Sequence, residues 1–365
     1  MATAFNLLRL PYAVLMLVLE QLEFRKRISL SILSKRVRMF VKLLEMKCDH
    51  INLKLKYGTI VMEVWVDKQE ELKLEMYTSG YVEFIYRHHI SLCNTSGVPP
   101  MDYACWVMDV MHCKSIHQFR IAQLSHYNIL PLLVSLPKIN EVIAEETHNS
   151  SSPDPRLQKI LKIVLPVSSA VTIPYHALKP EDLREIIRGN FDSVTVRKYS
   201  ADYMPSPDMK YSLNDLRMTN VKSLELAGPA FTLEDLNRYF KLWMEKICNP
   251  RLEYLRVWQN GSVNKDLLLD ELNSVQMPIR TNRKFKVLGN VTQLGSNEKI
   301  DFEFDITRVD GRTATIRISD YGTVCFYVWP ESTDDTTNRE PNQSSFMSRF
   351  SYLSTFYNSF IERFK

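Results

Sequence analysis

The chain has 365 residues, of which 45% are hydrophobic and 24% are charged, and its formal net charge is +4. These values are typical of a folded soluble protein and exclude an intrinsically disordered chain. No apolar run reaches the ~18 residues that a membrane span needs. The short apolar run from Ala13 to Leu19 ends at Glu20 without a small-residue cleavage site, so we expect neither a membrane partner nor a secretory leader.

The positive charge is concentrated at the N-terminal end. Residues 1–60 hold eleven Lys and Arg against four Asp and Glu, a net charge of +7, so the remainder carries −3. A basic head on a mildly acidic body favours an acidic partner for the head. Nucleic acid is one such partner, but base stacking needs interleaved aromatic residues, and Leu7 to Leu44 contains only Tyr12, Phe24 and Phe40. We expect no nucleic acid and keep a basic nucleic-acid binder as an alternative.

Six cysteines are spread along the chain with neither a CxxC pair nor the spacing of a disulfide framework: Cys48, Cys93, Cys105, Cys113, Cys248 and Cys325. The pattern predicts reduced thiols in a reducing compartment, the cytoplasm or the nucleus. The His/Cys groupings, His112-Cys113 with His117 and His88-His89 with Cys93, lack zinc-finger spacing. We expect no bound metal and no cofactor.

The densest apolar stretch runs from Phe5 to Leu44. Pro11 suits the first turn of a helix, where its missing N–H would have no partner. Four apolar residues then recur at helical spacing: Val14, Leu15, Val18 and Leu22. A second stripe, with steps of three or four, comprises Leu30, Leu33, Val37, Val41 and Leu44. So small a module has too little core to bury all of this surface, and we interpret the stretch as a docking surface.

The residues of this stretch resemble an F-box. The resemblance rests on the Leu7-x-x-Leu10-Pro11 start and on residues 28–37, ISLSILSKRV. It implies a three-helix module at residues 1–48 that binds the Skp adaptor of cullin-based ubiquitin ligases. The residues that it implies for adaptor binding are Leu10, Pro11, Val14, Leu15, Val18, Leu22, Ile28, Leu30 and Leu33. An ordinary helical hairpin packed on its own domain is the alternative.

The next region alternates apolar and polar residues. The alternation predicts strands at Ile60–Val66, Leu72–Tyr77 and Tyr81–Tyr86, the first two joined as a hairpin. From Met101 the pattern changes to helix followed by strand, twice. The predicted helices are Asp102–Cys113 and Tyr127–Leu136, and the predicted strands are Ser115–Ala122 and Ile139–Glu145.

Clearer strand–helix cycles follow. Lys179-Pro180-Glu181-Asp182 predicts a helix with acidic residues in its first turn, and Thr232 is a suitable N-cap for another. Predicted strands begin near residues 193, 222 and 252, about 30 residues apart. One strand and one helix in each unit resembles a short solenoid of the leucine-rich-repeat kind. The strand face of such a solenoid is a natural binding surface.

The C-terminal part is predicted to be a block of antiparallel strands. The expected strands are Phe302–Val309, Arg312–Ser319 and Thr323–Trp329. Asp310-Gly311 between the first two is a strong hairpin signal, because glycine tolerates the positive φ of the turn. Polar residues 331–345 predict a flexible linker. Six apolar residues at steps of three or four then predict an amphipathic helix: Phe346, Phe350, Leu353, Phe356, Phe360 and Phe364.

The body carries a second resemblance. Leu213–Val257 and Gly311–Pro330 resemble the second type of F-box-associated domain, from the large nematode F-box family, with Trp243 and Asn249-Pro250-Arg251-Leu252 as the most telling positions. The resemblance spans most of residues 50–330 and implies a domain that captures substrates. Residues 331–365 then form the linker and the terminal helix. The fold class that we expect is α+β or α/β.

A search of the sequence for catalytic motifs gives none. The chain has no GxGxxG, Walker or GxSxG motif, and it has only ten glycines. We therefore expect a non-catalytic receptor that binds the Skp adaptor, and through it a cullin, by the F-box and holds a protein substrate by the C-terminal domain. The alternative is an interaction scaffold that does not drive ubiquitination.

Overall fold

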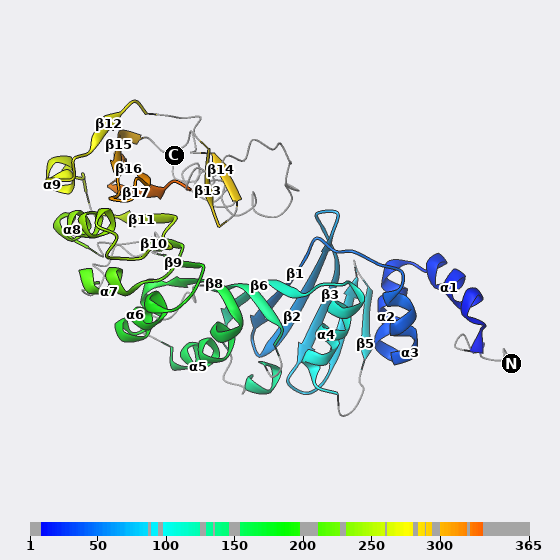
Figure 1. The fold of residues 1–365 in the computed structure, drawn as a ribbon. Helices are drawn as coiled ribbons and strands as arrows, with labels where there is room; N and C mark the ends of the chain where they lie inside the picture. The colour runs from blue at the N-terminus through cyan, green and yellow to red at the C-terminus, as the bar shows by residue number, and fades with distance from the viewer. Residues whose placement is uncertain are drawn as a thin grey trace, which may run out of the picture. The chain divides into compact units, whose positions relative to one another are not determined.

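The computed structural model describes residues 9–86, 89–93, 98–124, 129–133, 136–145, 154–197, 211–226, 231–259, 261–279, 284–288, 290–293, 300–319 and 322–330. Most of their helices and strands are labelled in Figure 1. The chain divides into two compact units, Met1–Ala177 and Leu178–Lys365. The predicted linker and C-terminal helix, residues 331–365, lie outside the described residues.

Three helices open the first unit: α1 (Tyr12–Gln21), α2 (Phe24–Leu33) and α3 (Lys35–Lys42). We call them the helical module. Ser34 separates α2 from α3, because its extended backbone (φ −144°) ends one helix and its hydroxyl accepts a hydrogen bond from Val37 N in the next. Each helix buries one side, and the buried apolar residues are Leu15, Leu19, Ile28, Ile32, Val37 and Val41.

The sheet of the first unit has the order β8-β7-β6-β1-β2-β3-β4-β5. Its strands are β1 (His50–Lys56), β2 (Thr59–Val66), β3 (Gln69–Tyr77), β4 (Val82–Tyr86), β5 (His89–Cys93), β6 (Ser115–Gln123), β7 (Lys138–Ala144) and β8 (Ser168–Pro174). Strands β1, β6, β7 and β8 run parallel, and β1 to β5 form an antiparallel meander (Figure 1). The helices are α4 (Pro100–Val110) and α5 (Pro155–Val164), with short 3-10 turns at Leu130–Leu133, Leu165–Val167 and Tyr175–Ala177.

The predicted strands of this unit are confirmed, and so is the helix that begins near Asp102. The helix predicted over Tyr127–Leu136 is wrong for the part that the structure describes, where only the 3-10 turn Leu130–Leu133 forms. A proline at position 131 has no N–H to donate within a regular helix, and its ring would clash with the preceding turn of such a helix. Sequence patterns missed β1, β5, α5 and β8.

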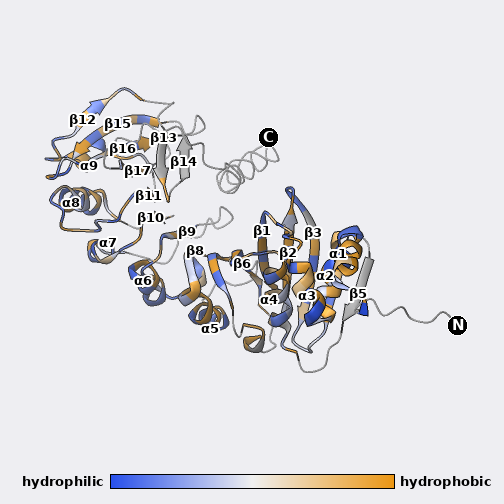
Figure 2. Ribbon diagram, turned by 45° about the vertical axis from the view of Figure 1, so that its right-hand side comes forward, coloured by the Kyte–Doolittle hydropathy of each residue, from blue (hydrophilic) through white to orange (hydrophobic). Residues whose placement is uncertain are grey.

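The second unit contains the strand–helix cycles. Strands β9 (Ser193–Arg197), β10 (Ser223–Leu226) and β11 (Tyr254–Trp258) are parallel, with the register Ser193, Ser223, Tyr254. Helices α6 (Pro180–Arg188), α7 (Leu213–Met218) and α8 (Leu233–Met244) each precede one of these strands. The spacing of about 30 residues is thus confirmed. In Figure 2, α6 and α8 carry both hydrophobic and hydrophilic residues, as expected of helices with one buried side.

Antiparallel strands complete this sheet, whose order is β9-β10-β11-β17-β16-β15-β12. They are β12 (Val275–Met277), β15 (Ile300–Thr307), β16 (Thr313–Ser319) and β17 (Thr323–Val328). A short helix α9 (Lys265–Leu269) and a separate hairpin of β13 (Lys284–Val287) and β14 (Asn290–Gln293) were not predicted individually. The predicted turn at Asp310-Gly311 is confirmed, and Gly311 has φ +88°.

Aromatic residues dominate the core of the second unit. Trp243 and Phe240 of α8 are fully buried, and both rings pack on Phe326 of β17. The Phe240 and Phe326 ring centres are 4.8 Å apart, and the Trp243 ring meets that of Phe326 edge-on at 5.1 Å. The contact joins a helix of the repeating part to the antiparallel strands, so the two parts share one core.

Candidate functional site

The surface of the helical module carries several exposed apolar side chains. Of the nine residues that we expected to contact the adaptor, Pro11, Val14 and Leu33 are exposed, Leu10, Val18, Leu22 and Leu30 are partly exposed, and Leu15 and Ile28 are buried. Exposed apolar residues outside the expected set are Tyr12, Leu17, Met39 and Leu43. The helical pattern missed Tyr12 and Leu17 because α1 is apolar on more than one side, so spacing alone does not tell which side faces the core.

Two arginines of the basic cluster have a structural role. Arg27 donates from Nε to Leu22 O at 2.7 Å and from Nη2 to Glu20 O at 2.6 Å, which satisfies carbonyls at the end of α1. Arg38 donates from Nε to Ser31 O at 3.0 Å and so joins α3 to α2. These two charges therefore hold the helical module together, whereas Lys35 and Arg36 are exposed at the start of α3.

Helix α3 is fastened to α4 by a row of contacts, which we call the α3–α4 clasp. The Arg38 guanidinium lies 3.8 Å from the centre of the Trp106 ring, and Lys42 Nζ lies 2.5 Å from Asp109 Oδ1. The ring Nε2 of His112 is hydrogen-bonded to Lys42 O at 2.9 Å. Arg38 and Lys42 are four residues apart on α3, and their partners Trp106 and Asp109 are three residues apart on α4. Such spacing is expected of two helices packed side by side.

One face of the parallel strands in the second unit carries no buried apolar row. Val194, Leu224 and Leu255 lie in register on the opposite face and are buried. On the face in question Ser223 and Tyr254 are buried, and five further residues that alternate with the apolar row are partly exposed: Thr195, Arg197, Glu225, Arg256 and Trp258. We call this set the open strand face.

Charge and aromatic surface meet at one end of the open strand face. The Arg256 guanidinium lies 4.2 Å from the centre of the Trp258 ring. A guanidinium over an indole is attracted by the ring, and both arginine and tryptophan are enriched at protein-binding surfaces. Beside it, Leu288 N donates to Glu253 Oε2 at 2.6 Å, and Val287 packs with Tyr254 and Tyr327, so the β13–β14 hairpin covers the start of β11.

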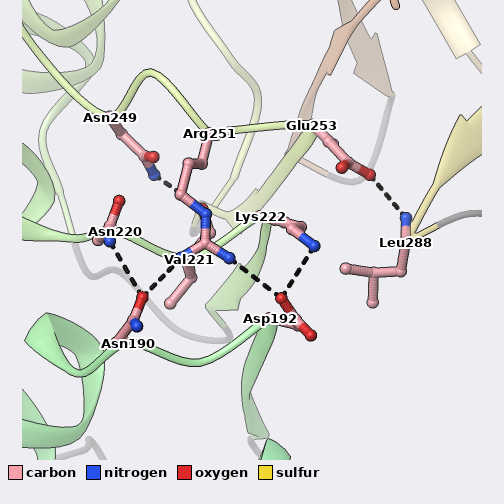
Figure 3. Close-up of polar contacts among 9 residues, drawn as sticks. All are labelled: Asn190, Asp192, Asn220, Val221, Lys222, Asn249, Arg251, Glu253 and Leu288. Atoms are coloured by element: carbon pink, nitrogen blue, oxygen red, sulfur yellow. Dashed lines mark hydrogen bonds and ion pairs between the residues drawn. The ribbon is translucent and has the colours of Figure 1, made fainter.

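Polar side chains tie together the loops that enter the three parallel strands (Figure 3). Arg251 donates to Asn190 Oδ1 at 2.6 Å and to Asp192 Oδ1 at 3.1 Å. Lys222 Nζ lies 3.0 Å from the same Asp192 oxygen, and Asn220 Nδ2 donates to Asn190 Oδ1 at 3.0 Å. Each strand entry thus contributes to one network, which fixes the spacing of the strands.

Asn249 and Pro250 explain how the last of these loops is shaped. Asn249 is buried with a positive φ of 25°, and its Nδ2 donates to Val221 O at 2.9 Å (Figure 3). Asparagine tolerates this backbone region better than most residues. Helix α8 has already ended at Met244, and the turn through Asn249 and Pro250 places Arg251 against Asn190 and Asp192.

The described part of the chain offers no arrangement typical of catalysis. Its residues contain no group of three His, Cys, Asp or Glu side chains placed to hold a metal ion. Burial raises the pKa of the Tyr239 and Tyr254 hydroxyls well above their ordinary values, and burial together with Asp102 raises that of the Cys105 thiol. These groups are held neutral, which is the opposite of an activated nucleophile or base. None of the helices that the structure describes is long and apolar enough to cross a membrane.

Two family models match the chain. The F-box domain model matches residues 7–49, which contain the helical module. The F-box associated model matches residues 182–257, which contain the parallel strands and the network of Figure 3. No curated protein and no solved structure matched. The chain therefore combines an N-terminal F-box with an F-box-associated region, as the resemblance in its sequence predicted.

Proposed function

We propose that this chain is the substrate-recognition subunit of a Skp–cullin–F-box ubiquitin ligase. In this role the helical module binds the Skp adaptor, the adaptor connects it to the cullin, and the second unit holds a protein substrate. The chain itself needs no catalytic group in this role. It raises the rate of ubiquitin transfer by holding the substrate near the loaded enzyme, which turns a bimolecular step into an effectively intramolecular one.

The observation that carries the proposal is the F-box match over a module with unburied apolar residues. Val14, Leu17 and Leu33 are 43%, 62% and 63% exposed. Burial of apolar surface stabilises a complex by about 25 cal/mol per Å², so a few such side chains account for a firm interface. Exposed Lys35 and Arg36 speed the encounter with an acidic adaptor more than they tighten the complex.

The open strand face is the substrate-binding surface in this proposal. It combines partly exposed polar side chains with the Arg256–Trp258 pair, and arginine and tryptophan are enriched at protein interfaces. Support comes also from the F-box associated match, which contains four of its five residues and ends one residue before Trp258.

Adaptor binding is tested by co-purification of the full chain with a Skp adaptor. We expect a Val14→Asp/Leu33→Asp double variant to bind roughly 100-fold more weakly, because each charge replaces ~1.5 kcal/mol of apolar burial. These positions are exposed, so the fold tolerates the change. Leu15→Asp would be uninformative, since Leu15 is buried.

The matched control is Met218→Asp/Ile247→Asp, which places two charges at exposed apolar positions of the second unit. It should bind the adaptor like the wild type. Equal binding by the wild type and the Val14/Leu33 variant would refute the proposed adaptor surface.

A receptor is distinguished from a scaffold by ubiquitination of captured partners in cells. We expect a set of proteins to co-purify with the wild type but not with a Thr195→Arg/Glu225→Arg variant of the open strand face. Ubiquitination of that set should require an intact helical module. If these partners bind the Val14/Leu33 variant normally and their ubiquitination is unchanged, the scaffold is supported instead.

A further inference from the structure

Two cysteine sulfurs lie in contact where the helical module meets the rest of the first unit. Cys48 is in the connection from α3 to β1, and Cys113 lies just after α4. Their Sγ atoms are 3.3 Å apart, and both residues are partly exposed and carry free thiols. A disulfide bond is about 2.05 Å long, so closing the pair needs a sulfur displacement on the order of 1 Å, which side-chain rotation supplies.

We propose that Cys48 and Cys113 are an oxidation site at which a peroxide converts the two thiols into a disulfide, locking the helical module onto the α4 side of the first unit. The inference stands on the geometry of the two sulfurs and their surroundings, and it does not depend on adaptor binding.

The chemistry needs one peroxide molecule for each disulfide. The Cys113 thiolate attacks a peroxide oxygen, the O–O bond breaks, and a sulfenic acid forms while the other oxygen leaves as water after taking up a proton. The Cys48 thiol then attacks the sulfenic sulfur: its proton goes to the leaving oxygen, the S–O bond breaks, the S–S bond forms, and the second oxygen leaves as water. In total, two thiols are oxidised, hydrogen peroxide is reduced, and two water molecules leave. A small thiol reductant reverses the change by exchange.

The surroundings favour Cys113 as the first sulfur to react. The hydrogen bond from Cys48 lowers the pKa of the Cys113 thiol, an effect that outweighs the opposing effect of burial. A thiolate is the nucleophile in peroxide attack, and partial exposure gives the oxidant access. Cys48 is already in contact, which is the arrangement of a reacting cysteine with its resolving partner.

The other described cysteines are placed less favourably. Cys248 and Cys325 are buried, with Cys248 Sγ against Tyr239 O and Cys325 Sγ against the Tyr254 hydroxyl. Cys105 is partly exposed, but burial and Asp102 raise the pKa of its thiol. Cys105 is therefore the control. It lies in α4, the helix just before Cys113, and the pKa of its thiol is raised rather than lowered.

The position of the pair gives the oxidation a structural consequence. The α3–α4 clasp next to it consists of contacts such as Lys42–Asp109, whose side chains are 43% and 48% exposed. Exposed ion pairs contribute little to stability, so in the dithiol form this end of the α3–α4 clasp opens at modest cost. A disulfide between Cys48 and Cys113 replaces this reversible attachment by a covalent one and fixes where the module stands relative to the sheet of its own unit.

The test uses the reduced full chain, treated with hydrogen peroxide, alkylated and digested. We expect a cross-linked peptide pair joining Cys48 to Cys113, lighter by two hydrogen atoms than the sum of its parts and restored by dithiothreitol. Cys105→Ser should form it as the wild type does, and Cys48→Ser should lose it and accumulate oxidised Cys113. Hydrogen exchange in α3 and the start of β1 should slow in the oxidised chain and recover on reduction.

Two outcomes would overturn the proposal. One is a Cys48–Cys113 peptide that stays absent while both cysteines are alkylated, and the other is a disulfide between different cysteines. The serine variants exchange one atom at partly exposed sites, and their folding is checked by thermal unfolding. If a variant unfolds, alkylation of the native wild-type chain before peroxide treatment must abolish the cross-link instead.

Discussion

The guanidinium of Arg38 lies over the indole of Trp106, 3.8 Å from the ring centre, and joins the F-box helix α3 to α4. The same side chain donates a hydrogen bond to Ser31 O in α2. Arg38 thus joins its own helix to two others. It is the second arginine of the run Ser34-Lys35-Arg36-Val37-Arg38. The attachment of the F-box to the rest of its unit is therefore specific rather than a flexible tether.

A double-mutant cycle on this pair should reveal a favourable coupling. We expect Arg38→Ala and Trp106→Ala to be less destabilising together than the sum of the single changes, by about 1 kcal/mol, since a partly buried cation–π contact has roughly this strength. The measurement is urea unfolding of the full chain. Lys42→Ala with Asp109→Ala is the control cycle, and an exposed ion pair of this kind should couple by ~0.5 kcal/mol or less. Additive changes at Arg38 and Trp106 would contradict the expectation.

Local signals predicted much of this fold. Alternation predicted β2, β3 and the strands β15 to β17, Asp310-Gly311 predicted a turn, and the Thr232 N-cap predicted the start of α8. The same approach missed β1, which pairs in parallel with β6 and antiparallel with β2. Apolar and polar residues alternate from Ile51 to Lys56, a local strand signal that the prediction left out. Only the parallel pairing with β6, more than 60 residues away in the chain, is a contact that no local pattern records.

The candidate site was predictable only to the level of the segment. The sequence motifs predicted the F-box, but Leu15 is buried whereas its neighbour Val14 is 43% exposed. Both residues fit the same apolar stripe, and the choice between them depends on how α1 packs on α2 and α3. The contact between Cys48 and Cys113 was likewise hidden, because it joins residues 65 positions apart.

Two glycines with similar backbones should respond differently to alanine. Gly322 and Gly311 both have positive φ, +77° and +88°. A Cβ at Gly322 would lie 2.7 Å from Gln259 O and closer still to Gly261 O, whereas one at Gly311 would meet nothing within 4 Å. Gly311→Ala should cost about 1 kcal/mol of unfolding free energy from the backbone alone. Gly322→Ala should cost roughly 1–3 kcal/mol more, because backbone atoms must move.

Unfolding of the two variants in urea checks this difference, with Gly311→Ala as the control for the positive φ. Gln259 N also donates to Gly322 O at 2.8 Å, so a displaced turn weakens the link from the end of β11 to β17. Equal losses in the two variants would mean that the close approach of the loop does not restrict Gly322.

Glu303 and Arg317 form an ion pair that is almost fully buried. Arg317 Nε and Nη2 lie 3.0 Å and 2.9 Å from Glu303 Oε2, and the side chains are 3% and 0% exposed for Arg317 and Glu303. Arg317→Leu should destabilise the chain by about 3–5 kcal/mol, because it leaves a buried carboxylate without this guanidinium. The double variant Glu303→Met/Arg317→Leu should recover most of the loss, since no charge is then buried. Chemical unfolding distinguishes the two, and a double variant as unstable as the single one would contradict the argument.

Asp215 should make the stability of the second unit depend on pH. Its carboxylate is 2% exposed and accepts hydrogen bonds from Ser212 N and Ser212 Oγ, both at 2.9 Å, and from Arg188 Nη2 at 2.6 Å. Burial by itself raises the pKa of Asp215, but the hydrogen bonds from Ser212 and the Arg188 charge outweigh it, so the pKa lies below the ordinary 3.8. Ser212 and Asp215 form a capping box at the start of α7.

The sign of the effect follows from the lowered pKa. The folded chain holds the proton of Asp215 less tightly than the unfolded chain, so the stabilisation is complete above the unfolded pKa and is lost as the pH falls through the folded one. Asp215→Asn should therefore cost about 1–3 kcal/mol at pH 7, because a buried charge-assisted network is broken. Between about pH 5 and pH 3 the wild type should lose stability more steeply than the variant, so that the two unfolding free energies converge. Urea unfolding across this range measures the convergence.

Glu234→Gln, an exposed first-turn change in α8, should shift stability by only ~0.3 kcal/mol and leave the slope unchanged. Parallel curves for the wild type and Asp215→Asn would show that the carboxylate is not the source of the pH dependence.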